Sequence, residues 1–118
     1  MIANWPGTTP AGVVKQDMVV FTDMLPTFVE LAGGKTASGI TIDGHSFAPQ
    51  LRGEKGKPRD WIYMQLGKKA YIRDSRWKLT NDGEFFDMRN APFVQIPVPS
   101  NTTDSEARSA RQRLQKEL

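Results

Sequence analysis

The second half of the chain consists of short β-prone runs that alternate with turn residues. The runs are DWIYMQL, KAYIRD, RWKLTND and GEFFDMR, and they are separated by Gly67, Asp74-Ser75 and Asn81-Asp82-Gly83. Short runs interrupted in this way are typical of strands joined by tight turns. Asp82-Gly83 is a strong hairpin signal because both residue types tolerate a positive φ. The pattern predicts an antiparallel meander of three or four strands.

One face of this meander needs a cover. Alternation along RWKLTND places Trp77 and Leu79 on one face and Lys78 and Thr80 on the other. A helix after the proline-rich link APFVQIPVPSN supplies the cover, since Thr103 and Glu106 match a capping box. We expect Ile72 and Phe85 to join the buried face. The apolar stripe of the helix is Ala107, Ala110, Leu114 and Leu118.

The first part of the chain predicts a strand and then a helix. MIANW is an apolar run that closes at Pro6-Gly7, as a strand ending in a turn does. A strand that starts at the first residue indicates that the chain is part of a longer protein. TDMLPTFVELAGG is typical of a helix that Thr22 caps and Gly33-Gly34 end. Pro26 lies in its first turn, where a missing N–H costs little.

The helix predicted from TDMLPTFVELAGG has one apolar face and leads into an irregular segment. Residues at helical spacing on that face are Leu25, Phe28, Val29 and Ala32. From Gly33 to Gly56 the composition shifts to Gly, Thr, Ser and Asp, with one helical turn expected near Phe47 to Leu51. The predicted organisation is therefore α+β: a strand and helix in residues 1–34, an irregular connector in 35–58, and the antiparallel unit with its terminal helix in 59–118.

The composition excludes several kinds of site. The 118 residues include no cysteine and a single histidine, His45. Disulfides, thiolate zinc sites, a cysteine nucleophile and metal sites with two histidines are therefore excluded for this chain. The formal charge of +3 suits anionic partners but is equally explained by solvated Lys and Arg. No apolar run approaches the roughly 20 residues of a membrane span, and MIANWPG is not a signal peptide.

Few residues of the chain are candidates for a catalytic or metal-binding role. His45 in DGHSF could act as a general base, and Asp23 and Asp43 could be metal ligands. A loop histidine, and carboxylates that cap a helix or turn, explain all three without a site. GGKT at residues 33–36 lacks the earlier glycine and the preceding strand of a phosphate-binding loop. We therefore expect no catalytic and no metal-binding residue in the chain.

Aromatic and basic residues also alternate in the second half, where they could stack on nucleic-acid bases. Core aromatics beside a charged, solvated face explain the same pattern better, so we expect neither a nucleic acid nor a membrane as partner. The residues concerned are Trp61, Tyr63, Tyr71 and Trp77 with Lys68, Lys69, Arg73 and Arg76.

Five motifs in order resemble the closing third of bacterial sulfatases, which are arylsulfatase-like members of the alkaline phosphatase superfamily. That family shows a strand before Trp-Pro-Gly, then Asp-x-x-Pro-Thr and Leu-Ala-Gly around a helix. Asp-Gly-x-Ser with Leu-x-Gly comes next, then Arg-x-x-x-Trp-Lys-Leu, then Glu-Leu-Tyr/Phe-Asp-Leu. The matching stretches are MIANWPG, DMLPTFVELAG, IDGHSFAPQLRG, and IRDSRWKLT with GEFFDM. The resemblance runs from residue 1 to about residue 92.

The resemblance implies that this chain supplies structural parts of a longer enzyme whose catalytic groups lie elsewhere. Residues 1–34 would be the last strand and helix at the edge of a large α/β domain, and 59–118 its small C-terminal subdomain. The family's catalytic groups lie upstream: a Cys or Ser oxidised to formylglycine, paired Asp residues on calcium, and Lys and His residues that hold the sulfate. This chain contains none of these positions and would be inactive alone, since sulfate-ester cleavage needs an activated nucleophile and a cation.

The same resemblance bears on the partners of the chain and on the alternatives. The implied partner is the missing N-terminal catalytic domain, and residues 1–34 could also mediate self-association through an unpaired strand edge. The complete protein would be periplasmic or secreted if it is like its family. The strand WIYMQLG lacks the histidine step of many relatives, so Gln65 and Lys68 are weak candidates for substrate contact. Two alternatives stay open: a free-standing module that binds sulfated glycans, and part of a phosphate or phosphonate ester hydrolase.

Overall fold

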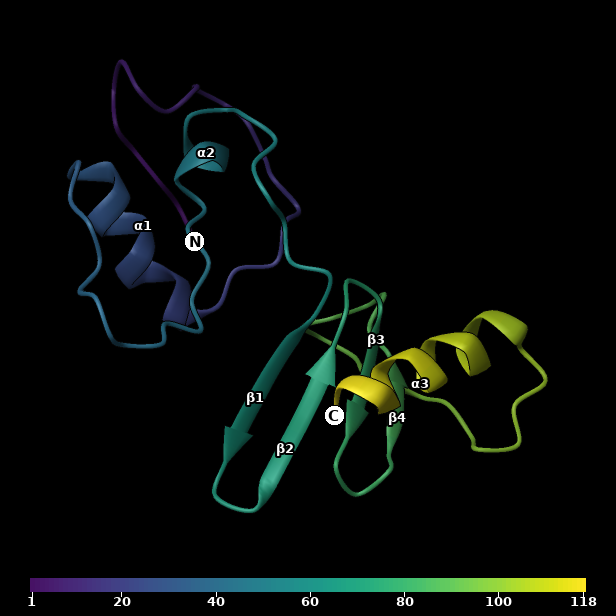
Figure 1. Ribbon diagram of the computed structural model, residues 1–118. Coiled ribbons are helices and arrows are strands. Elements are labelled where there is room, and N and C mark those ends of the chain that lie inside the picture. Colours follow the sequence, from purple (N-terminus) through teal and green to yellow (C-terminus); the bar gives the residue numbers. More distant parts are fainter. The chain divides into compact units, whose positions relative to one another are not determined.

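The computed structural model describes all residues 1–118, which divide into two compact units, Met1–Arg59 and Asp60–Leu118 (Figure 1). The first unit contains a 3-10 turn, η1 (Phe21–Asp23), and two short helices, α1 (Met24–Leu31) and α2 (Ala48–Leu51). The second contains a five-stranded sheet and one helix. None of the helices combines the length and the apolar character needed to cross a membrane.

Helix α1 begins and ends where local chemistry favours it. The Asp23 carboxylate accepts a hydrogen bond from Val20 N at 3.0 Å and so caps η1, which leads directly into α1. Thr22, the predicted N-cap, lies inside η1 instead, because the extra turn starts the helical segment earlier than the sequence pattern shows. Gly33 ends the helix as predicted: its φ is +68° and its N–H bonds Glu30 O at 3.0 Å.

The apolar face of α1 is uncovered. Leu25 and Phe28 are 57% and 63% exposed, whereas Thr27 is fully buried. A hydrogen bond from Phe47 N to the Thr27 hydroxyl joins the helix to the segment before α2, and most of the apolar stripe of the helix is left at the surface.

Residues 1–5 form no strand, so the N-terminal strand that the sequence predicts is wrong for this chain. A strand needs a second strand to pair its N–H and C=O groups, and Met1–Arg59 contains none. The segment instead ends in a turn in which the Thr8 and Thr9 N–H groups donate to Trp5 O at 3.0 and 2.9 Å. Met1 and Ile2 are 78% and 96% exposed.

The predicted antiparallel meander is confirmed in the second unit. Its strands pair in sequence order: β1 (Ile62–Leu66), β2 (Lys69–Arg73), β3 (Trp77–Thr80), β4 (Phe85–Asp87) and β5 (Ile96–Pro97). The sheet has five strands, one more than the three or four predicted, because the two-residue β5 forms within the proline-rich link. Proline is tolerated there because β5 is an edge strand, where an N–H is not needed on the open side.

Helix α3 (Ser105–Glu117) packs on one face of this sheet, as predicted (Figure 1). Its N-cap is Asp104, not Thr103: the Asp104 carboxylate accepts from Glu106 N and Ala107 N at 2.9 and 3.3 Å. The side chain of Glu106 is thereby free to bind elsewhere. Trp77 and Phe85 stack with their ring centroids 5.2 Å apart. The core consists of Ile72, Trp77, Leu79, Phe85, Ala107, Ala110 and Leu114.

The turn between β3 and β4 depends on Gly83, whose φ is +85°. Asp82 has a negative φ, so only the glycine of the predicted pair uses the left-handed region. We expect Gly83→Val to destabilise the chain by about 1 kcal/mol or more, because a β-branched residue is strained at positive φ. Thermal unfolding monitored by circular dichroism measures this. The control is Asp82→Val, since residue 82 needs no positive φ, and equal melting temperatures for the two variants would contradict the assignment.

Candidate functional site

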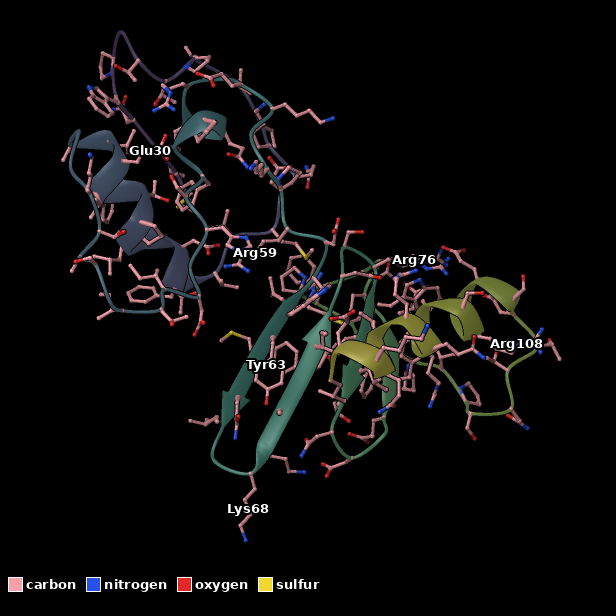
Figure 2. All side chains as sticks on the ribbon, in the orientation of Figure 1. Glu30, Arg59, Tyr63, Lys68, Arg76 and Arg108 are labelled. Carbon is pink, nitrogen blue, oxygen red and sulfur yellow. The ribbon has the colours of Figure 1, made fainter.

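A buried carboxylate organises the first unit. Asp23 is 1% exposed. Its Oδ1 accepts from His45 N at 2.8 Å, and both its oxygens accept from the Arg59 guanidinium at 2.5–3.2 Å (Figure 2 labels Arg59). Arg59 also donates to Asp43 O at 2.9 Å. One side chain therefore ties the start of α1 to two loop segments that are remote in sequence.

Thr27 makes a second tie between the same segments. Its hydroxyl donates to Asp23 O at 2.7 Å and accepts from Phe47 N at 3.0 Å. The loop approaches so closely that a Cβ on Gly44 would lie 2.0 Å from Thr22 O, which only glycine avoids. The motifs Asp-x-x-Pro-Thr and Asp-Gly-x-Ser therefore form one polar junction.

The three candidate residues predicted from the sequence, Asp23, Asp43 and His45, all lie at this junction, but each contributes a different chemical group. Asp23 contributes its carboxylate, His45 its backbone N–H, and Asp43 its backbone carbonyl. The His45 and Asp43 side chains are exposed. No group of three or more His, Asp or Glu side chains in the chain is placed to hold a metal ion. The junction therefore has a structural role: it holds the start of α1, the 43–47 loop and Arg59 together.

Burial of Asp23 acts to raise its pKa, because a charge is less stable away from water. The hydrogen bonds from Arg59, Val20 N and His45 N, together with the Arg59 charge, more than offset this effect, so that the pKa of Asp23 lies below its ordinary value of 3.8. The carboxylate is therefore ionised in the folded protein at neutral pH.

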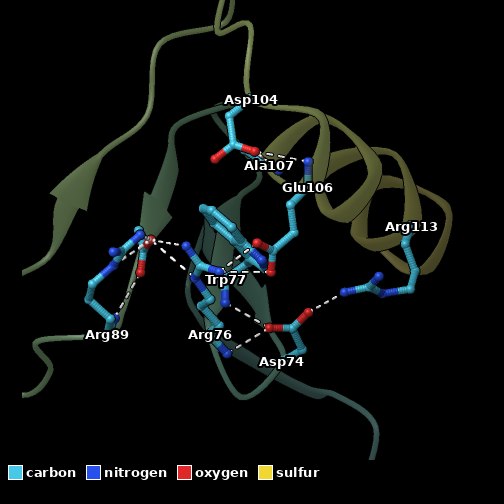
Figure 3. A network of polar contacts seen from close by, with 9 residues as sticks. Asp74, Arg76, Trp77, Arg89, Asp104, Glu106, Ala107 and Arg113 are labelled. Atoms are coloured by element: carbon cyan, nitrogen blue, oxygen red, sulfur yellow. Dashed lines mark hydrogen bonds and ion pairs between the residues drawn. The ribbon is translucent and has the colours of Figure 1, made fainter.

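A second polar network joins β4 to α3 in the other unit (Figure 3). Asp87, 3% exposed, accepts from Arg76 Nε and Nη2 at 3.2 and 3.0 Å and from Arg89 N and Nε at 2.9 Å. Arg76 Nη1 donates to both carboxylate oxygens of Glu106 on α3, at 2.8 and 2.7 Å. The Arg76 guanidinium also lies 4.4 Å from the Trp77 ring centroid. Arg76 is thus the link between the sheet and the first turn of the helix.

Asp74 closes the same network at the β2–β3 turn. Its Oδ1 accepts from Arg76 N and Trp77 N at 2.8 and 2.6 Å, and its Oδ2 accepts from Arg113 Nη2 at 2.5 Å. The carboxylate fixes the turn that presents Trp77 to the core and holds the middle of α3. The pairing of this turn carboxylate with a helix arginine therefore has a structural role.

The stability of the fold should fall in acid through these carboxylates. The hydrogen bonds from Arg89 and Arg76 outweigh the effect of burial and hold the pKa of Asp87 well below 3.8, and that of Asp23 is also lowered. A carboxyl whose pKa is lower when folded stabilises above its unfolded pKa and loses this stabilisation as pH falls. We expect a falling melting temperature below about pH 4. Melting curves at pH 7, 5 and 3 measure it, and an Asp87→Asn variant should show a weaker pH dependence.

The aromatic and basic residues of the second half do not gather on one surface. Trp77 is buried under α3, whereas Tyr71 and Phe86 lie on the opposite face, where Lys78 Nζ is 4.8 and 5.3 Å from their ring centroids. Gln65 and Lys68 are exposed at the β1–β2 hairpin (Figure 2 labels Lys68 at its tip). The Gln65 side chain binds Gly67 O at 3.0 Å and Tyr63 Oη at 2.9 Å.

Sequence reasoning missed the basic partners of the buried carboxylates. Arg59 lies 36 residues from Asp23, and Arg113 lies 39 residues from Asp74. Spacing along the chain carries no signal for such pairs, because only the fold brings them together. The apolar stripe of α3 indicated the face on which Arg113 would lie, but not its partner.

Comparison with known proteins decides the family. No protein-family model matches the chain. An ulvan-active sulfatase of Formosa agariphila is 32% identical over 87 residues, which are 65% of this chain and 17% of that protein. Human arylsulfatase D is 32% identical over 83 residues, which are 70% of this chain and 14% of that protein. The chain is a C-terminal portion of a sulfatase-family protein.

Solved structures agree with this assignment. A 2-O GAG sulfatase superposes with a TM-score of 0.61 and 26% identity over 80% of this chain and 23% of that one. A crystal structure of a putative sulfatase from Bacteroides thetaiotaomicron gives the same values. The chain spans about a sixth of the length of the two curated sulfatases it matches. The two solved structures therefore share this fold over four fifths of the chain.

Proposed function

We propose that this chain is part of an enzyme that hydrolyses sulfate esters, and that the catalytic groups of that enzyme lie outside these 118 residues. The observation that carries the proposal is the 32% identity to two curated sulfatases. An alignment of 83 or 87 residues must include parts of both units, since each unit has 59 residues. The likeness is therefore not confined to one short motif.

The residues of the chain do not fit the cofactors that the family implies. Formylglycine needs a Cys or Ser in a Cys/Ser-x-Pro-x-Arg motif, and no such motif occurs in the sequence. Calcium needs several carboxylate or carbonyl oxygens around one point, and the Asp23 carboxylate is occupied by Arg59 and two backbone N–H groups. We assign calcium and formylglycine to the complete enzyme, and we derive no step of the reaction from this chain.

The surface of the first unit supports a partner domain. Its exposed apolar side chains include Ile2, Val14, Phe21, Leu25 and Phe28, with exposed fractions from 57% to 96%. A hollow of about 1160 Å³ also lies between the N-terminal segment and the α2 segment. Surfaces of this kind are normally covered in a folded protein. The remainder of the catalytic domain is the partner that we propose, and self-association through residues 1–34 is the outcome that we expect where that domain is missing.

The coding sequence upstream tests the proposal. A Cys/Ser-x-Pro-x-Arg motif in the same reading frame is the expected result. A Thr or Ser nucleophile without that motif would instead indicate a phosphate or phosphonate ester hydrolase. A stop codon with an independent promoter would indicate a free-standing module.

Activity measurements provide the second test. We expect the longer protein to hydrolyse a generic aryl sulfate and the 118-residue chain to show no turnover, with or without calcium. Turnover by the short chain that survives repurification would contradict the proposal. His45→Ala would then show whether the activity depends on the single histidine.

A further inference from the structure

Strand β1 is an edge strand with unpaired backbone groups along its outer side. Its only neighbour in the sheet is β2. The two strands are joined by the two-residue turn Gly67-Lys68, with Gly67 at a φ of +59° and Leu66 opposite Lys69. In such a hairpin the closing pair is hydrogen-bonded, and every second pair beyond it is hydrogen-bonded too. Tyr63 and Gln65 therefore direct their backbone N–H and C=O groups away from β2.

The charges, prolines and bulges that normally protect an edge strand are absent from β1. Natural edges carry charges, prolines or bulges, or are covered by another element. The sequence IYMQL has no charge and no proline, and its register with β2 is continuous from Ile62 to Leu66. Tyr63, Met64 and Leu66 are 42%, 43% and 87% exposed. An edge of this kind is suited to receive a further strand.

We propose that β1 pairs antiparallel with β1 of a second copy of this chain, about a two-fold axis through Met64. In this register Tyr63 lies opposite Gln65 of the other copy, so that their outward N–H and C=O groups bond reciprocally. Ile62 lies opposite Leu66 of the other copy, and Met64 opposite Met64. These apolar residues share one face because side chains alternate along a strand. The two sheets become one.

The charges that flank β1 select this register. Pairing about Met64 places Lys68 at the hairpin tip opposite Asp60 of the other copy, and two-fold symmetry makes this contact twice. Both residues are exposed, and neither forms an ion pair within its own chain. A shift by one residue would place Ile62, Met64 and Leu66 opposite residues of the other copy whose side chains lie on the opposite face of the sheet. A shift by two would separate the opposite charges.

The contact is small, and its size limits its strength. A pair of five-residue strands covers less than the roughly 1,600 Å² of a standard stable interface. We therefore expect a dimer that dissociates on dilution. The inference does not depend on the proposed sulfate-ester chemistry, because it rests on the second unit of this chain alone.

The first experiment is sedimentation velocity of the complete chain over a range of concentrations. Gln65→Pro removes an N–H that points outward and blocks the approach of a second strand, while leaving the bonds of β1 to β2 in place. We expect it to weaken dimerisation at least tenfold. Gln65→Thr, which keeps the N–H, is the matched control and should dimerise like the parent chain. Far-UV circular dichroism verifies that both variants are folded.

The second experiment tests the register with charges and needs no backbone change. Lys68→Asp and Asp60→Lys should each weaken the dimer about fivefold, because each creates two like-charge contacts. The double variant restores opposite charges and should regain the parent dissociation constant. High salt should reduce these differences.

Three results would overturn the proposal. One is a chain that stays monomeric at every concentration reached. Another is association that Gln65→Pro and Gln65→Thr alter to the same extent, because the contact expected through residues 1–34 would then be the only one between copies. The third is a double charge variant whose dimer is weakened by the combined effects of the two single variants, with no recovery of the parent dissociation constant.

Discussion

Asp23→Ala is expected to unfold much of the first unit. The substitution leaves the Arg59 guanidinium, whose side chain is 13% exposed, without its partner, and it also frees Val20 N and His45 N. Removing one member of a buried ion pair typically costs about 3–5 kcal/mol, because the other charge stays buried and unpaired. Such a loss is a large part of the stability of a small unit. Hydrogen exchange followed by mass spectrometry should show the loss of protection in residues 1–59.

Asp43 provides the matched control for this experiment. It is an exposed aspartate of the same junction, and it contributes only its backbone carbonyl to Arg59. Asp43→Ala should therefore leave exchange in residues 1–59 almost unchanged. Asp23→Asn keeps the shape of the side chain but removes the charge, and should fall between the two. Equal protection in the Asp23→Ala and Asp43→Ala variants would show that the carboxylate does not hold the unit together.

The second unit could be predicted because its determinants are local. Alternation along β2 and β3 places Ile72 and Leu79 inward, and both are fully buried. The stripe of α3 indicates its packing face in the same way, with Ala110 and Leu114 each 1% exposed. The observed N-cap of α3, Asp104, lies one residue after the predicted Thr103. Both residue types are good N-caps, and only the geometry of the folded chain distinguishes them.

The first unit was harder to predict because its elements depend on remote partners. MIANW has the composition of a strand, but no second strand lies in Met1–Arg59 to pair with it. The amphipathic pattern of α1 predicts a covered face, yet Leu25 and Phe28 are exposed. Periodicity specifies which residues could be buried, and it does not supply the surface that buries them.

The polar junction could be predicted in part, less fully than the second unit and better than the strand and the covered helix face of the first. The motifs that carry the resemblance to sulfatases name Asp23, Thr27 and Gly44, and the structure explains why these residue types are needed. The motifs do not name Arg59, whose charge makes the burial of Asp23 tolerable. A carboxylate at a helix start is explained by capping alone, so its position along the chain does not point to a distant cation.

Leu79→Ala is expected to destabilise the second unit strongly. Leu79 is fully buried in β3 and belongs to the core cluster that α3 covers. Truncation of such a leucine costs about 2–5 kcal/mol, since transfer energy is lost and a cavity remains. For a unit of 59 residues a loss of this size should lower the melting temperature by roughly 10 °C or more. Thermal unfolding followed through near-UV circular dichroism of Trp77 and its neighbours measures the change.

Leu66→Ala is the matched control, because Leu66 belongs to the same sheet but is 87% exposed. At a protein concentration low enough to keep the chain monomeric, it should change stability by less than about 0.5 kcal/mol. The two variants remove the same atoms, so the difference between them isolates the contribution of burial. A comparable melting temperature for both would mean that α3 does not hold Leu79 in a close-packed core, and that the sheet is stabilised by its hydrogen bonds and turns alone.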